Sequence, residues 1–337
     1  MDLSGRPVLV TGGAGFIGSN LVDALVDRGC AVRVLDDLSV GREENLVEAA
    51  ARGEVELVRG SILDRDLVRD AVRGVDAVLH LAVSCLRVSL YDPWESHEVN
   101  AGGTLSVLEA CREDRVGRFL YCSSSEVYGT ARTVPMGESH PTEPTTVYGA
   151  SKLAGEWYSL AYREAHGLPV VVARPFNTYG PREHHEGPHG EVIPKMVLRA
   201  LNGVAPVIFG DGSQTRDFTY VSDTVRGLIA AAESDALVSE SVNVAFGREV
   251  PIARIAELVL AACASDLRPV YADPRPADVT RHYADPSKAQ RVLGFRAETP
   301  IEDGIERYVR WLLEREPDVG QLLSEEVERN WKAALPQ

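Results

Sequence analysis

The first half of the chain alternates two kinds of segment, and this alternation limits the folds that the chain can adopt. Short runs rich in β-branched residues predict strands at Pro7–Thr11, Ala31–Leu35, Val55–Arg59, Val75–Leu81, Phe119–Cys122 and Pro169–Ala173. Apolar residues at helical spacing predict helices between them, at Phe16–Asp27, Asp64–Val72, Ser96–Cys111 and Tyr148–Ala165. Strands that alternate with helices indicate βαβ units, so we expect an α/β fold with a doubly wound parallel sheet.

The composition of the chain changes after Pro175. Glycine and proline become frequent, which favours a loop-rich region suited to enclosing a ligand. Helices are still predicted there, at Val192–Leu201, Ile252–Ala262 and Ile301–Glu314. We therefore expect a first domain over residues 1–176, rejoined by about 217–247, and a smaller domain formed mainly by residues 177–337.

Charge and cysteine content restrict the possible partners and the compartment. The formal net charge of −15 argues against nonspecific binding to nucleic acid or to anionic membranes. The five cysteines are scattered and form no C-x-x-C pair, which favours a reducing cytoplasm over a disulfide framework or a zinc site. No secretory signal is visible, and no apolar stretch reaches the roughly 20 residues that span a bilayer. No metal is expected, because the adjacent His184 and His185 lack the spacing of a zinc site.

A glycine-rich motif lies between the first predicted strand and the first predicted helix. Gly12, Gly15 and Gly18 have the spacing G-x-x-G-x-x-G, which allows a tight turn and the close approach of a pyrophosphate to a helix N-terminus. Asp36 ends the second strand, where a carboxylate accepts hydrogen bonds from ribose hydroxyls and repels a 2′-phosphate. No arginine directly follows Asp36, so NAD is favoured over NADP.

A tyrosine and a lysine four residues apart form the second motif. Tyr148 and Lys152 share one face of a predicted helix, where the ammonium group can stabilise a phenolate and so lower the pKa of the tyrosine. Ser123-Ser124-Ser125-Glu126 follows the strand Phe119–Cys122, at the end of a parallel strand where α/β sheets bind ligands. A serine hydroxyl there could hydrogen-bond both the tyrosine and a substrate oxygen.

These motifs, with His80-Leu81-Ala82, Asn100, Val127-Tyr128-Gly129 and Arg174-Pro175-Phe176-Asn177, occur in one order along the chain. As a set they resemble the extended short-chain dehydrogenase/reductase family, in its nucleotide-sugar epimerase and dehydratase branch. The resemblance implies a Rossmann-type fold with a C-terminal substrate-binding domain, a bound NAD that is reduced and reoxidised in each cycle, and a homodimer formed through the helices Ser96–Cys111 and Tyr148–Ala165.

The resemblance also implies site residues. The catalytic residues would be Ser124, Tyr148 and Lys152, with Ser125 and Glu126 as further candidates. The cofactor would be held by Gly12, Gly15, Phe16, Ile17, Gly18, Asp36, Asp37, Ser61, Ile62, Leu81, Ala82, Asn100, Tyr148, Lys152 and Pro175. The nucleoside-diphosphate sugar would be bound by Arg87, Ser89, Asn177, Arg182, Arg216, Arg275 and His282. Two arginines, Arg216 and Arg275, would bind the diphosphate, because a guanidinium fork matches phosphate oxygens.

Every enzyme of the branch first oxidises C4 of the sugar, so the residues near the ketone decide the reaction. A 4-epimerase needs no further acid or base, whereas a 4,6-dehydratase typically carries an Asp-Glu pair where this chain has Ser125 and Glu126. UDP-glucuronate decarboxylases and GDP-mannose dehydratases resemble this chain more closely, since they have a Ser-Glu pair. The decarboxylases also have an arginine where this chain has His282, with Arg281 one residue earlier. We therefore favour 4-epimerisation, with dehydration or decarboxylation as alternatives. A non-catalytic NAD sensor and a simple NAD(P)H-consuming reductase are the other classes considered.

Overall fold

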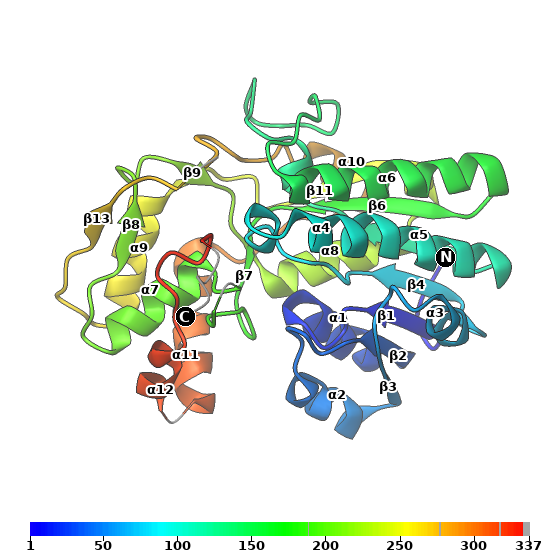
Figure 1. The fold of residues 1–337 in the computed structure, drawn as a ribbon, viewed down its shortest axis with the longest axis horizontal. Coiled ribbons are helices and arrows are strands. Elements are labelled where there is room, and N and C mark those ends of the chain that lie inside the picture. The colour runs from blue at the N-terminus through cyan, green and yellow to red at the C-terminus, as the bar shows by residue number, and fades with distance from the viewer. Residues whose placement is uncertain (188, 276–277, 317, 333–337) are drawn as a thin grey trace.

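A parallel sheet of seven strands forms the centre of the computed structural model, which describes residues 1–187, 189–275, 278–316 and 318–332 (Figure 1). Its strands are β1 (Pro7–Thr11), β2 (Ala31–Asp36), β3 (Val55–Arg59), β4 (Ala77–His80), β5 (Arg118–Cys122), β6 (Val170–Pro175) and β11 (Ser241–Val244). The order across the sheet is β11-β6-β5-β4-β1-β2-β3, so the chain changes direction between β1 and β4. In open α/β sheets, the crevice at such a switch point binds ligands.

Helices cover both faces of this sheet, as the alternating sequence predicted. They are α1 (Phe16–Asp27), α2 (Val47–Arg52), α3 (Arg65–Val72), α4 (Pro93–His97), α5 (Thr104–Glu113), α6 (Val147–His166), α8 (Val221–Glu233) and α10 (Ser287–Leu293). Val8 and Val10 of β1 pack in one core with α1 and α8, while Leu9 between them packs in the opposite core with α3 and α5. Because neighbouring strand residues face opposite layers, both must be apolar.

The helix predicted over Ser96–Cys111 is interrupted. The structure forms α4, then a π-helical stretch over Glu98–Gly103, and then α5. The hydroxyl of Thr104 donates to the carbonyl oxygen of Asn100 at 2.6 Å. Such π stretches often occur at functional sites, and this one places Asn100 near the carboxyl ends of the strands.

The C-terminal part has its own apolar core between helices α7 (Val192–Leu201), α9 (Ile252–Ala262) and α11 (Ile301–Arg315). Short strand pairs accompany it: β7 (Thr178–Tyr179) with β10 (Thr219–Tyr220), β9 (Thr215–Arg216) with β12 (Val250–Pro251), and β8 (Val207–Phe209) with β13 (Val270–Ala272). After α12 (Val319–Ser324), the chain returns to lie beside α7, seen in red in Figure 1.

No helix in the part of the chain that the structure describes combines the length and the apolar character needed to cross a bilayer.

Candidate active site

The glycine-rich turn between β1 and α1 leaves no space for a side chain at Gly12 or Gly18. Gly12 has a φ of +69°, and a Cβ there would lie 2.7 Å from the backbone nitrogen of Ala82. A Cβ on Gly18 would collide with the carbonyl oxygen of Gly12. No side chain caps the start of α1, where Gly15 is the N-cap residue. The amide groups at this end of α1 are therefore suited to an anion such as a pyrophosphate.

Asp36 joins this turn to the end of β2. Its carboxylate accepts hydrogen bonds from the backbone N–H groups of Ala14 and Leu38, each at 2.9 Å. Burial raises the pKa of Asp36, and these two hydrogen bonds lower it. Asp37 is exposed and its carboxylate accepts from Ser39 in a turn. An oriented acceptor beside the glycine turn fits the ribose of NAD.

The other predicted cofactor residues lie at the same edge of the sheet. They follow or end its strands: Ser61 and Ile62 after β3, Leu81 and Ala82 after β4, and Pro175 at the end of β6. Thr11 organises part of this edge, since its hydroxyl accepts from the N–H groups of Leu81 and Ala82, both at 3.2 Å.

The side-chain amide of Asn100 is hydrogen-bonded within the protein. Its Oδ1 accepts from the N–H of Ser84 at 2.8 Å, and its Nδ2 donates to the Ser84 carbonyl and to the hydroxyls of Ser96 and Ser151. The side chain is buried and engaged on both ends. Asn100 thus ties the loop after β4 to α6, and its direct contact with the cofactor stays a prediction.

Ser124 and Tyr148 meet where β5 ends and α6 begins. Ser124 caps a 3₁₀ turn over Ser125–Val127, and its hydroxyl accepts from the N–H of Glu126 at 3.2 Å. Burial raises the pKa of Tyr148 above its ordinary value of 10, and a hydrogen bond with Ser124 lowers it in part. The hydroxyl pair predicted from the sequence is therefore present, but burial outweighs the expected lowering of the tyrosine pKa.

Lys152 lies one helical turn after Tyr148 and is almost fully buried. Its ammonium nitrogen is 4.5 Å from the centroid of the Tyr121 ring. Burial lowers the pKa of Lys152 from 10.5 to about 8, so the ammonium form still predominates at neutral pH. The side chain thus keeps a positive charge within the protein, over the Tyr121 ring and one helical turn from Tyr148.

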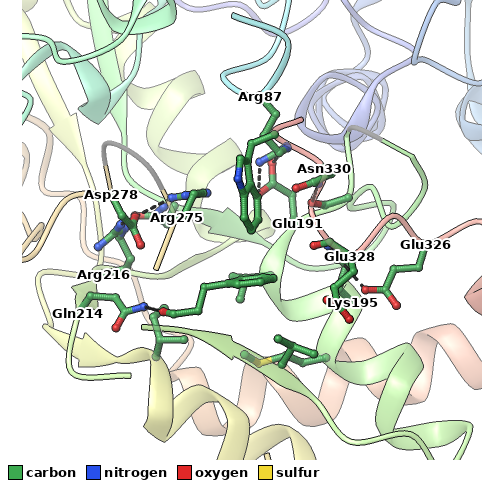
Figure 2. Close-up of a pocket in the computed structure, with 18 of the residues that line it drawn as sticks. Arg87, Glu191, Lys195, Gln214, Arg216, Arg275, Asp278, Glu326, Glu328 and Asn330 are labelled. Atoms are coloured by element: carbon green, nitrogen blue, oxygen red, sulfur yellow. Dashed lines mark hydrogen bonds and ion pairs between the residues drawn. The ribbon is translucent and has the colours of Figure 1, made fainter. Parts of the chain in front are cut away.

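A cavity of about 150 Å³ lies beside this site, bordered by α7, β8 and the C-terminal residues. Figure 2 shows Arg216, Arg275 and Asp278 on one side of it and Lys195 on the other (Figure 2). Asn177 also lines the cavity, and its buried Oδ1 has no hydrogen-bond partner within the described residues. Because buried polar atoms are normally hydrogen-bonded, we expect this oxygen to accept a hydrogen bond from a bound ligand.

Arg216 and Arg275 converge, as predicted. Both guanidinium groups donate to the same oxygen of Asp278, at 2.6 and 2.7 Å. Glu126 shares a smaller pocket with these three side chains. Burial raises the pKa of Glu126, and the two arginines lower it. The two neighbouring guanidinium groups are therefore suited to hydrogen-bond the oxygens of a phosphate.

Three predicted substrate-binding residues do not line this cavity, and their substrate contacts stay predictions: Arg182, Ser89 and His282. The guanidinium of Arg182 pairs with Asp23 of α1 at 2.6 Å. The hydroxyl of Ser89 donates to the carbonyl of Leu86 at 2.7 Å and serves its own turn. His282 is fully buried behind Ser125. These side chains support the walls of the site, while the predicted Arg87 does line the cavity and pairs with Glu191 at 2.6 Å.

Sequence reasoning missed several residues of the cavity: Glu191, Lys195, Arg199, Phe209, Glu326 and Trp331. The helical pattern of Val192–Leu201 was visible, but not which face would border a ligand. Within the described residues, no cluster of three or more histidine, cysteine or acidic side chains could hold a metal.

Comparison with known proteins agrees with this geometry. The NAD dependent epimerase/dehydratase family matches residues 8–245. A UDP-glucose 4-epimerase of Mycolicibacterium smegmatis is 36% identical over 90% of this chain and 97% of its own length. A dTDP-glucose 4,6-dehydratase of Actinoplanes is also 36% identical, over 90% of this chain and 97% of its own.

A solved structure extends the likeness to three dimensions. The dTDP-glucose 4,6-dehydratase of Streptomyces venezuelae, solved with NAD bound, superposes with a TM-score of 0.88 at 32% identity, over 94% of this chain and 99% of that one. The glycine turn, the aspartate that ends β2 and the Ser–Tyr–Lys set fit this relationship. The chain is an enzyme that belongs to the NAD-dependent epimerase/dehydratase family.

Proposed function

We propose that this enzyme inverts C4 of a nucleoside-diphosphate sugar through a transient 4-keto sugar. The observation that carries the proposal is the pair at positions 125 and 126. Ser125 is buried and offers no acid beside Glu126, and its carbonyl is turned to His282. A reaction that only oxidises and re-reduces C4 needs no second acid at this place.

The described residues support the oxidation step. The Tyr148 phenolate, hydrogen-bonded to Ser124, would accept the proton of the C4 hydroxyl. The buried ammonium of Lys152, one helical turn further along α6, would supply a positive charge on the same face of the helix. Bound NAD supplies a reversible hydride acceptor for the same carbon. After the keto-sugar turns over, the same hydride would return to the opposite face of C4 while Tyr148 returns the proton to the C4 oxygen, so no atoms are gained or lost.

The alternatives find less support. For decarboxylation, an arginine would be needed near position 282, but His282 is buried and its pKa is lowered to about 3 by burial, so it is uncharged. Arg281 is exposed and pairs with Glu249 at 2.7 Å. For 4,6-elimination, Glu126 would have to act without the neighbouring acid.

The test is product analysis by mass spectrometry and NMR after incubation with UDP-glucose, UDP-glucuronate, dTDP-glucose and GDP-mannose. We expect a product of unchanged mass and a new configuration at C4. Loss of water or of carbon dioxide would refute epimerisation in favour of the corresponding lyase. Stoichiometric consumption of added NADH would indicate a reductase, and NAD binding without turnover of any sugar would indicate a sensor.

We also propose that the enzyme is a cytoplasmic homodimer joined through α5 and α6. Leu105 of α5 is 40% exposed and Trp157 of α6 is 63% exposed, which leaves apolar surface for a second copy. All five cysteines are free, in keeping with a reducing compartment. Light scattering of the wild type and of Trp157→Glu tests the dimer: the substitution should yield monomers.

A further inference from the structure

Residues 325–332, which we call the C-terminal strap, contribute four residues to the lining of the cavity: Glu326, Glu328, Asn330 and Trp331. Glu326 pairs with Arg199 through both oxygens, at 3.0 and 2.8 Å, and lies 3.7 Å from the ammonium of Lys195. Lys195 also donates to the carbonyls of Val327 and Glu328. The strap is therefore held against α7 along several of its residues.

Further contacts hold both ends of the strap. The N–H of Gly187 donates to the carbonyl of Glu325 at 2.9 Å, and the Asn330 amide donates to the carbonyl of Gly190 at 2.8 Å. The Glu326 side chain is only 5% exposed although it is charged. A buried carboxylate that is matched by two cations marks a specific position and not a loosely attached tail.

This anchoring delivers Trp331 to the cavity. Its indole contacts the ring of Phe209 edge to face, with centroids 4.6 Å apart. Both rings line the cavity, and Trp331 is only partly buried. A planar ring that enters the cavity would thus meet an aromatic surface that is already formed.

The cavity therefore combines an aromatic wall with the cationic pair Arg216 and Arg275. Both features suit a nucleoside diphosphate, because its base can stack on aromatic rings and its phosphate oxygens can accept hydrogen bonds from guanidinium groups. We propose that Trp331 is a substrate-contacting residue that forms, with Phe209, the compartment for the nucleobase. This inference rests on the proposed function, since it presumes a nucleotide-linked substrate.

The test compares Trp331→Ala, Trp331→Phe and the control Val327→Ala, whose substituted side chain is exposed on the same strap. UDP, dTDP and inorganic pyrophosphate are titrated into the NAD-loaded proteins by calorimetry, and KM and kcat are measured with the substrate that the wild type converts. We expect Trp331→Ala to weaken binding of the preferred nucleotide and to raise KM about 10-fold, with kcat nearly unchanged. Pyrophosphate affinity should stay the same, because pyrophosphate has no base.

Trp331→Phe should restore most of the affinity, and Val327→Ala should match the wild type. Glu326→Gln, which weakens the anchor on Arg199, should raise KM in the same direction as Trp331→Ala. Unchanged or tighter nucleotide binding in Trp331→Ala would overturn the inference, as would an equal loss for pyrophosphate. If the wild type bound neither nucleotide and converted no sugar, the proposed function itself would fail.

Discussion

His282 donates a hydrogen bond from its Nε2 atom to the backbone carbonyl of Ser125 across 3.1 Å, although the two residues are 157 positions apart. The centroid of the His282 ring also lies 5.2 Å from the centroid of the Phe176 ring. The histidine thereby fixes the turn that carries Ser124, without touching the cavity itself.

This contact predicts a pH-dependent stability. Burial lowers the pKa of His282 to about 3, while an unfolded histidine titrates near 6.5, so unfolding takes up a proton between these values. The contribution of the neutral His282 ring to the free energy of unfolding is complete above pH 6.5. As the pH falls below this value, that contribution decreases by ~1.4 kcal/mol per pH unit. Denaturant unfolding of the wild type and of His282→Gln, which keeps an N–H donor, should show their stability difference shrinking from pH 7 to pH 5. His80 has the same shift but is common to both proteins. A difference independent of pH would contradict this role of His282.

Replacement of Tyr148 by phenylalanine should reduce kcat by about 10²- to 10⁴-fold, because it removes the proton acceptor. The NAD content of the purified protein should remain near that of the wild type. Steady-state kinetics and cofactor analysis measure both quantities. Tyr271→Phe, at a ring that is 59% exposed, is the matched control. Retained turnover in Tyr148→Phe would exclude the assigned role.

Replacement of Arg216 or Arg275 by methionine should raise KM for the nucleotide sugar by about 10- to 100-fold, since each loses a hydrogen bond from a charged group. The kcat should change only a few-fold, because the phosphates lie away from C4. Arg281→Met is the control, as Arg281 is exposed and pairs with Glu249. Equal KM values for all three variants would argue against a diphosphate at Asp278.

Gly18→Ala should lower the NAD content of the purified protein at least about tenfold, because its Cβ would push the carbonyl of Gly12 out of the turn. Gly137→Ala is the control, since no atom lies within 4 Å of a Cβ there. Cofactor release and chromatography provide the measurement. Normal NAD content in Gly18→Ala would contradict the close approach assigned to this turn.

Local patterns predicted much of the fold. The strands Pro7–Thr11 and Val55–Arg59 and the helix Phe16–Asp27 have the predicted bounds. They are short elements with unbroken apolar spacing and glycine at their ends, so neighbouring residues suffice to define them. The π-helical stretch at Asn100 was not foreseen, because it depends on contacts with Ser84 and Ser151 that only the fold creates.

Asp36 and the serines at 123–125 could be recognised as site candidates because they lie at the carboxyl ends of parallel strands, which is a defined place. The choice of Ser124 among these serines came from the family resemblance. Arg182 and His282 lie in loops, where the sequence contains no sign of the direction of a side chain. Trp331 is distant in sequence from the other cavity residues, and the ion pairs and hydrogen bonds of the C-terminal strap bring it to the cavity.

The carboxylate shared by Arg216 and Arg275 has a consequence for how fast a substrate arrives. With Asp278 between them and Glu126 beside them, the two guanidinium charges are balanced locally, and the whole chain carries a formal charge of −15. Long-range attraction therefore does little to draw an anionic nucleotide toward the cavity. The negative charge of the chain should instead repel an anionic nucleotide at long range, so the association rate should rise as added salt screens this repulsion, and recognition begins only when phosphate oxygens reach the guanidinium groups.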